Sequence, residues 1–207
     1  MADTSATGNT HVFKAVFGDR WDDLPTVMKK HYAPRADSGD VVRVVGHLDV
    51  RVAWFMRAAA RITGMLVPYS GNNVPVTVTF TSHDDRSLQL DRVFRFPGRK
   101  PVRFRSRMEH IGGNELIEFM RFGIGWKLAC HWDGTKVILA HRGYIWRMFG
   151  VNFPVPLALA IGRGHAEEVP LTDNDFSMWT HSSHPLFGQV FGYAGSFRIE
   201  EVTCAPS

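Results

Sequence analysis

Apolar and polar residues alternate along most of this chain with a period of two. In residues 76–81 valine and phenylalanine alternate with threonine, so one face of the segment is apolar and the other polar, as in a half-buried strand. The same alternation recurs in residues 48–52, 88–96, 102–108, 116–124, 126–132, 137–146, 176–181 and 190–199. We therefore expect about nine strands joined mostly by short turns, such as the hairpin signal Trp132-Asp133-Gly134-Thr135.

Two segments have the period of an amphipathic helix instead. The first follows the N-cap candidates Asp22 and Asp23 and ends before Pro34. Its apolar face consists of Leu24, Val27, Met28, His31 and Tyr32. The second covers residues 53–63, where three successive alanines favour a helix and Gly64 can end it. His31 is therefore expected on the buried face of its helix.

Many strands with few helices predict a mainly β (α+β) protein. Strands with one apolar face need a cover, which a sheet obtains by rolling around itself or around a helix. We expect one antiparallel sheet rolled into a barrel or half-barrel, with about two helices packed in or across it. Residues 11–201 are expected to form this single β-rich domain, between flexible tails at residues 1–10 and 202–207.

Composition narrows the functional classes. Hydrophobic residues make up 44% of the 207 residues and aromatic ones 12%, which suits a globular domain with a thick core or an apolar pocket. Cys130 and Cys204 are too few for a disulfide framework. Neither a secretory signal nor a clean membrane span is visible, so we expect a soluble cytoplasmic protein. A net charge of +4 is too small for a dedicated nucleic-acid-binding protein.

Several strands place one polar residue on their apolar face. These residues are Arg92, Ser106, His110, Glu118 and Tyr193. A buried ionised group must be paired or its pKa shifts, which leaves two interpretations. In the structural one, Arg92 and Glu118 form a buried ion pair, while Ser106 and Tyr193 satisfy backbone groups. In the functional one, Arg92 anchors an anionic or carbonyl group, and His110, Glu118 or His31 moves a proton.

The functional interpretation defines candidate residues. The catalytic candidates are His110, Glu118, His31 and Tyr193. The ligand-binding candidates are Arg92, Ser106, Phe94, Phe104, Met120, Phe122 and His184. His181 and His184 alone supply too few ligands for zinc, and the chain lacks phosphate-loop and dinucleotide fingerprints. We therefore expect neither a metal nor a cofactor.

A dense run of basic residues extends from the end of the predicted strand at 88–96 through the predicted strand at 102–108. It consists of Arg95, Arg99, Lys100, Arg103, Arg105 and Arg107. Its simplest interpretation is the solvated face and turn of a hairpin. The alternative is a patch for anionic lipid head groups or phosphate.

A series of short motifs resembles the largely bacterial family catalogued as domain of unknown function 4166. The motifs are Phe17-Gly18-Asp19, Leu24-Pro25, His31, Leu66-Val67-Pro68, Gly71, Val74-Pro75-Val76, Leu90-x-Arg92-x-Phe94, Phe104-x-Ser106, Glu118, residues 150–154, His184-Pro185-Leu186-Phe187-Gly188 and Tyr193-Ala194-Gly195. The resemblance runs over residues 16–197, with Leu90 where the family usually has Trp and Phe153 where it has Leu. The family also occurs behind a dehydrogenase-like domain similar to saccharopine dehydrogenase, which implies association with a dehydrogenase-like protein.

The leading prediction is binding of a hydrophobic small molecule, lipid-like or polyketide-like, in a β-cup with Arg92 at its polar end. One alternative is a cofactor-independent isomerase, cyclase or hydrolase, with His110 or His31 as the base and Glu118 or Tyr193 as the acid. A second is a peripheral membrane or protein-interaction module, suggested by Trp54-Phe55-Met56 beside arginines. The expected partners are the small molecule and, weakly, an anionic membrane surface, without specific nucleic acid.

Overall fold

A computed structural model describes residues 11–84 and 87–204 of the chain. The strands are β1 (Val41–Val52), β2 (Gly71–Asp84), β3 (Ser87–Phe94), β4 (Val102–Gly112), β5 (Glu115–Phe119), β6 (Ile124–Trp132), β7 (Val137–Met148), β8 (Val151–Val155), β9 (Arg163–Pro170), β10 (Asp175–His184) and β11 (Gly188–Thr203). The helices are α1 (Val12–Phe17), α2 (Thr26–His31), α3 (Trp54–Thr63) and α4 (Ala158–Ile161), with 3-10 turns at Gly18–Trp21 and Arg121–Gly123. The flexible tail predicted at residues 1–10 lies outside the described residues.

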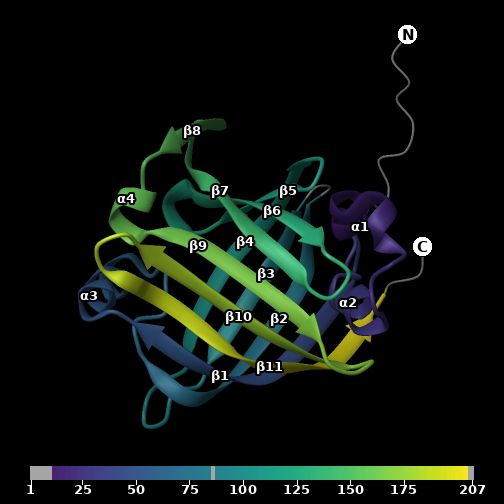
Figure 1. Ribbon diagram of the computed structural model, residues 1–207, viewed down its shortest axis with the longest axis horizontal. Helices are drawn as coiled ribbons and strands as arrows, with labels where there is room; N and C mark the ends of the chain where they lie inside the picture. Colours follow the sequence, from purple (N-terminus) through teal and green to yellow (C-terminus); the bar gives the residue numbers. More distant parts are fainter. Residues whose placement is uncertain (1–10, 85–86, 205–207) are drawn as a thin grey trace.

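The strands form a closed antiparallel barrel (Figure 1). The order around it is β6-β5-β4-β3-β2-β1-β11-β10-β9-β7, and pairing of β6 with β7 closes the ring. The short strand β8 pairs only with the far end of β7. The expected fold class, a rolled antiparallel sheet with few helices, is therefore confirmed.

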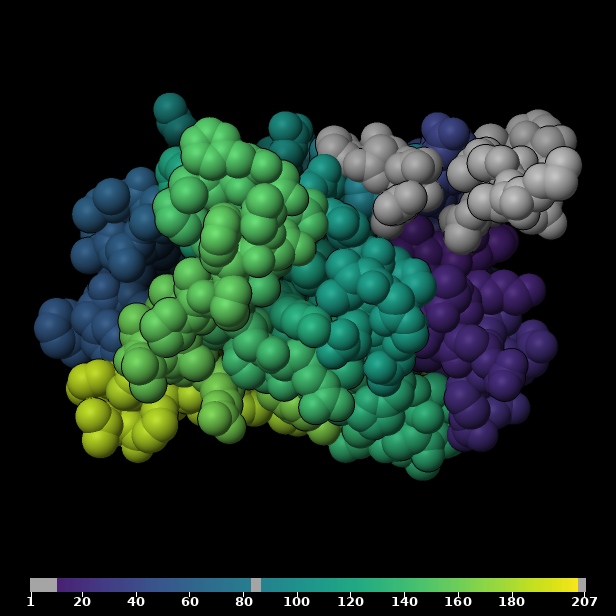
Figure 2. Space-filling view, turned by 90° about the horizontal axis from the view of Figure 1, so that it is seen from above, coloured from purple at the N-terminus to yellow at the C-terminus, as the bar shows by residue number. Residues whose placement is uncertain are grey.

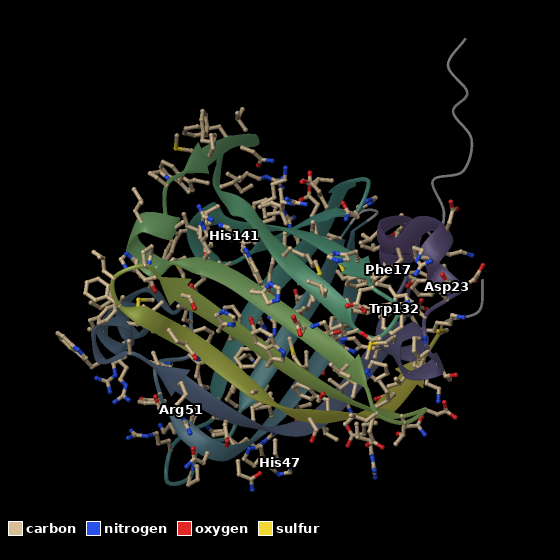
Figure 3. The ribbon with its side chains drawn as sticks, in the orientation of Figure 1. Phe17, Asp23, His47, Arg51, Trp132 and His141 are labelled. Atoms are coloured by element: carbon tan, nitrogen blue, oxygen red, sulfur yellow. The ribbon has the colours of Figure 1, made fainter. Side chains whose placement is uncertain are left out.

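The two ends of the barrel differ (Figures 1 and 2). Helices α1 and α2 lie at one end, called the plugged end, where Figure 3 places Phe17 of α1 near Trp132 at the end of β6. The other end, called the mouth, carries five connections between strands, at residues 53–70, 95–101, 120–123, 149–162 and 185–187. Because α3 and α4 belong to these connections, they border the mouth rather than fill the barrel.

The two predicted helices are present, and the structure adds others. Helix α3 ends as expected at Gly64, whose φ of 62° is the left-handed conformation that glycine adopts freely. Helix α2 is shorter than predicted and begins only at Thr26, after a turn. Helix α1 has six residues, too few for a periodic signal, but it buries Val12 and Phe13 and packs on β4 and β6.

The strand pattern departs from expectation at several places, and β1 and β2 begin before the predicted positions 48 and 76. The strand predicted at 116–124 ends at Phe119, because Phe122 and Gly123 take positive φ values of 60° and 73° in a tight turn. Strands β8 and β9 were not predicted, since the inward positions of β9 are Gly164, Ala166 and Glu168 and give no apolar alternation. Strand β11 continues to Thr203, two residues past the predicted domain end.

Candidate functional site

The mouth leads to a mainly apolar cavity of about 250 Å³, called the chamber. Helix α3 contributes Met56, Ala59 and Ala60, and the α4 segment contributes Leu157 and Ile161. The other apolar side chains of its wall are Met65, Leu66, Val67, Phe94, Phe104, Met120, Trp126 and Phe191. The predicted ligand-binding residues Phe94, Phe104 and Met120 therefore lie together in this wall.

Three of the predicted polar residues form one network at the inner side of the chamber. Neighbouring strands β3, β4 and β5 carry Arg92, Ser106 and Glu118. Arg92 donates from Nη1 to Ser106 Oγ at 2.8 Å, and its Nη2 lies 2.9 Å from Glu118 Oε1. Ser106 donates to the same Glu118 oxygen at 2.6 Å. This network, called the floor, is both a buried ion pair and part of the chamber lining, so it combines features of the two interpretations drawn from the sequence.

The electrostatics of the floor favour a charged Arg92. Burial opposes the cation, but the charge and hydrogen bond of Glu118, together with the charge of Glu168, outweigh burial and raise the pKa of Arg92 above its usual value. The guanidinium also lies over the Phe104 ring, 5.2 Å from its centroid, within reach of a cation–π interaction.

Tyr193 of β11 contacts both the chamber and the region behind the floor. Its ring packs edge-on against Phe94 and Phe191. Burial, opposed by Arg92 and reinforced by Glu118 and Glu168, raises its pKa, so the hydroxyl stays protonated. That hydroxyl makes no hydrogen bond within the described part of the chain, so it is a free donor beside Arg92.

A second cavity of about 60 Å³ lies behind the floor. It is lined by His31 of α2, by Tyr32 directly after this helix, and by Glu168 of β9. His31 Nε2 lies 3.6 Å from Glu168 Oε2, and the Tyr32 hydroxyl donates to the same oxygen. The other ring nitrogen of His31, Nδ1, is buried and has no hydrogen-bond partner among the described residues. A volume of this size accommodates ordered water.

The charges behind the floor stabilise one another. Burial alone would raise the pKa of Glu168, but His31, Tyr32 and then Arg92 outweigh it, so the carboxyl pKa is lowered. Burial and Glu168 raise the pKa of Tyr32 far above its usual value, which keeps this phenol a hydrogen-bond donor. Arg92 therefore interacts with two carboxylates, through direct contact with Glu118 at the floor and through longer-range attraction to Glu168 behind it.

Three predicted site residues lie outside the chamber, the floor and the cavity behind it. His110 shares the parity of Met108, but β4 is near its end there, and its Nε2 pairs with Gly113 O at 2.8 Å in an exposed hairpin. Phe122 is 69% exposed because the strand has already ended in the 3-10 turn. The two ring nitrogens of His184 are used by the backbone, with Nε2 at 2.9 Å from Leu159 O and Nδ1 accepting from the Leu186 N–H. The structure thus gives His184 a role in holding α4 against the end of β10.

Other polar groups near the chamber were missed by the sequence patterns. The inward position of Glu168 could not be predicted because β9 lacks apolar alternation. The Trp126 indole donates to His141 Nδ1 at 2.9 Å, and burial followed by the charge of Arg163 lowers the pKa of His141, in keeping with an acceptor. His181, considered from the sequence only as half of a metal pair, lines the chamber. Within residues 11–84 and 87–204, no group of three His, Cys, Asp or Glu side chains is arranged to hold a metal ion.

Comparisons with solved structures find distant similarity. Rv2717c from M. tuberculosis aligns with a TM-score of 0.42 and 11% identity, covering 89% of this chain and 99% of that one. A mutant of the fluorescent protein UnaG aligns with a TM-score of 0.33 and 13% identity, covering 83% and 97%. The dehydratase domain of the polyketide PpsC from M. tuberculosis gives a TM-score of 0.19 and 7% identity, covering 91% and 84%.

The family comparison is more decisive. No curated protein matches the chain significantly. A family model described as Domain of unknown function (DUF4166) matches residues 24–197. The match covers most of the chain and confirms the resemblance seen in the motifs from Leu24-Pro25 to Tyr193-Ala194-Gly195, so the protein belongs to the DUF4166 family.

Proposed function

We propose that the protein binds a small amphipathic molecule, with an apolar body in the chamber and a hydrogen-bond-accepting end on the floor. The observation that carries this proposal is the free, protonated Tyr193 hydroxyl beside the Arg92–Glu118 pair, at the inner side of a mainly apolar cavity. Ligand sites commonly combine an apolar wall with a few placed polar groups.

The charge state of the floor selects the polar end of the ligand. Arg92 is already neutralised by Glu118 at 2.9 Å and also faces Glu168. A carboxylate would bring a third negative charge into this buried region, at a cost in desolvation and repulsion. A neutral carbonyl accepts from Tyr193 and from spare N–H groups of Arg92 without that cost. We therefore assign a neutral ketone or ester as the preferred end.

The apolar body can be tested with a homologous series. Methyl esters of straight-chain acids displace a neutral apolar dye, N-phenyl-1-naphthylamine, from the protein. Each methylene buried in the chamber contributes about 0.8 kcal/mol, so affinity should rise by about fourfold per methylene and level off once the chamber is full. Affinity independent of chain length, or a carboxylate that binds more tightly than its methyl ester, would refute this assignment.

Tyr193→Phe tests the polar end. The substitution removes only a hydroxyl that has no partner among the described residues, so thermal stability should stay unchanged or rise slightly. Ester affinity should fall about fivefold, the effect of losing one hydrogen bond of about 1 kcal/mol. Tyr69→Phe is the matched control, because Tyr69 packs against Phe96 and lies outside the chamber lining. Equal effects of the two substitutions on affinity would remove Tyr193 from the site.

A further inference from the structure

The rim of the mouth exposes an unusual amount of apolar surface. Within the described residues, ten of the thirteen large hydrophobic side chains that are exposed belong to segments at this end. They are Trp54, Ile62, Phe122, Trp146, Phe149, Val151, Phe153, Leu159, Leu186 and Phe187. Phe149 is 94% exposed, Ile62 84% and Leu186 82%. Isolated exposed apolar residues are ordinary, but a set gathered at one end marks an interaction surface.

These side chains belong to segments that touch one another around the mouth. The Phe55 ring of α3 lies 5.4 Å from that of Phe187 in the β10–β11 connection. From there His184 bonds to Leu159 of α4 at 2.9 Å. Helix α3, the β10–β11 connection and α4 thus form one continuous side of the rim.

The other side is continuous as well. Strand β8 pairs Phe153 with Trp146 of β7, and the Trp146 indole donates to Phe122 O at 3.0 Å. Next to Phe122, the Arg121 guanidinium packs on Gly64 at the end of α3, so closely that a Cβ there would lie 2.6 Å from Arg121 Nη1. The apolar rim therefore surrounds the opening of the chamber and returns to α3.

The charges at the mouth have a single sign. Its five connections contain no Asp or Glu, and their basic residues are all exposed: Arg57, Arg61, Arg95, Arg99, Lys100 and Arg121. The segments at the plugged end carry both signs: the acidic residues there are Asp19, Asp22, Asp23, Asp37, Asp40, Asp133, Asp173, Asp175, Glu200 and Glu201, and the basic ones include Lys14, Arg20, Lys29, Lys30, Arg35, Lys136 and Arg198. The connections around the chamber opening are therefore purely basic, whereas the charges at the opposite end are mixed.

We propose that the mouth docks onto an anionic lipid bilayer, with the apolar rim inserted at the interface and the basic side chains against lipid head groups. Apolar tips combined with arginine and lysine are the chemistry that such an interface binds. A bilayer fits this rim better than a protein surface does, because the protruding tips come from separate segments and the charges have one sign. Among the described residues no helix is long and apolar enough to span a membrane, so the proposal concerns surface attachment.

Docking in this orientation opens the chamber toward the bilayer. An apolar molecule can then pass between lipid and chamber without crossing bulk water. The proposal goes beyond ligand binding and stands on the rim alone, so it is tested with vesicles that carry no chamber ligand.

Vesicle flotation tests the docking directly. The probes are phosphatidylcholine vesicles with and without about one-third phosphatidylserine. The wild-type chain should float with the anionic vesicles, bind the neutral ones much more weakly, and be released from the former at about 1 M salt, where charges are screened within about 3 Å.

Paired variants separate the mouth from the rest of the surface. Arg61→Gln/Lys100→Gln should weaken binding to anionic vesicles about 25-fold, since each basic residue at a membrane contributes about fivefold. Its control, Lys14→Gln/Arg20→Gln, removes the same charge at the plugged end and should change binding less than about twofold. Leu159→Ser/Leu186→Ser should also weaken binding at least about tenfold, whereas Ile111→Ser/Leu171→Ser, away from the mouth, should not.

Three outcomes would overturn the proposal. One is vesicle binding that the mouth and control variants reduce equally. Another is equal binding to neutral and anionic vesicles. The third is a wild-type chain that does not bind vesicles but forms a dimer, which the Leu159→Ser/Leu186→Ser substitutions dissociate. This result would assign the rim to a contact with a second copy of the chain.

Discussion

Glu118 is the residue whose removal most clearly tests the energetics of the floor. Its Oε1 accepts from Ser106 at 2.6 Å and lies 2.9 Å from Arg92 Nη2, and these side chains are almost fully buried. Glu118→Leu leaves Arg92 as a buried cation and Ser106 without its acceptor. Losing one partner of a buried pair costs about 3–5 kcal/mol. Because Glu168 also faces Arg92, we expect the lower end, about 3 kcal/mol.

The whole network can be replaced as a unit. In Arg92→Met/Ser106→Ala/Glu118→Leu no charge or hydroxyl of the floor is left unpartnered. Apolar replacement of a buried pair is often neutral or stabilising, so this triple variant should be more stable than Glu118→Leu alone. Urea unfolding of the wild type, Glu118→Leu, Arg92→Met and the triple variant measures the interaction energy among the floor residues.

The expected changes are large enough to measure. A loss of about 3 kcal/mol in a domain of this size lowers Tm by about 6–12 °C. The proposed coupling of the floor residues is refuted if Glu118→Leu costs less than about 1 kcal/mol. It is also refuted if the triple variant is destabilised by the sum of the costs of its single substitutions. A stable triple variant whose preference for methyl esters over alkanes is reduced, with the remainder lost on adding Tyr193→Phe, would show that the floor serves the ligand.

Three further substitutions test Glu168 behind the floor, the packing of Trp126 and the hydrogen bonds of His184. The pKa of Glu168 is lowered from 4.5 in the native state, so around this pH the native protein binds fewer protons than the unfolded chain. The ionised carboxylate therefore stabilises the folded state above pH 4.5, and this stabilisation is lost as the pH falls through the native pKa. Glu168→Gln should therefore lower the free energy of unfolding at pH 7, and the difference from wild type should shrink in acid. A difference that stays constant in a pH series of urea melts would contradict this. Gly164→Ala places a Cβ 2.8 Å from the Trp126 ring and should cost about 1–3 kcal/mol by overpacking; unchanged urea unfolding would show that Trp126 can move. His184→Ala should cost about 1–3 kcal/mol through the loss of its two partly buried hydrogen bonds to the backbone. His110→Ala removes one exposed bond and should cost less than about 1 kcal/mol, and equal costs would argue against this difference.

The alternation of residues was sufficient to predict the rolled sheet and most of the floor. Arg92, Ser106 and Glu118 lie on strands β3, β4 and β5, whose parity is unbroken up to those positions, so their inward direction followed from the period of two. Tyr193 could be placed for the same reason. The Arg92–Glu118 pair was one of two interpretations of the sequence, and deciding that it forms required the register between strands, which a single sequence does not contain.

The errors have specific physical causes. Phe122 was assigned to the chamber because positive φ values at Phe122 and Gly123, which end the strand, leave no mark in hydrophobic periodicity. Glu168 was missed because small residues occupy the other inward positions of β9. The apolar rim was only hinted at by Trp54-Phe55-Met56, since its members come from connections far apart in sequence and only the fold brings them together.

The position of a bound ester is the sharpest test of ligand binding in the chamber. Crystals soaked with a straight-chain methyl ester brominated at its far end would locate the bromine by anomalous scattering and the carbonyl in the density map. We expect the carbonyl oxygen within hydrogen-bond distance of the Tyr193 hydroxyl or Arg92, and the bromine in the chamber near Met56 and Ile161. An ester bound outside the barrel, or one with its bromine at the floor and its carbonyl at the mouth, would contradict it.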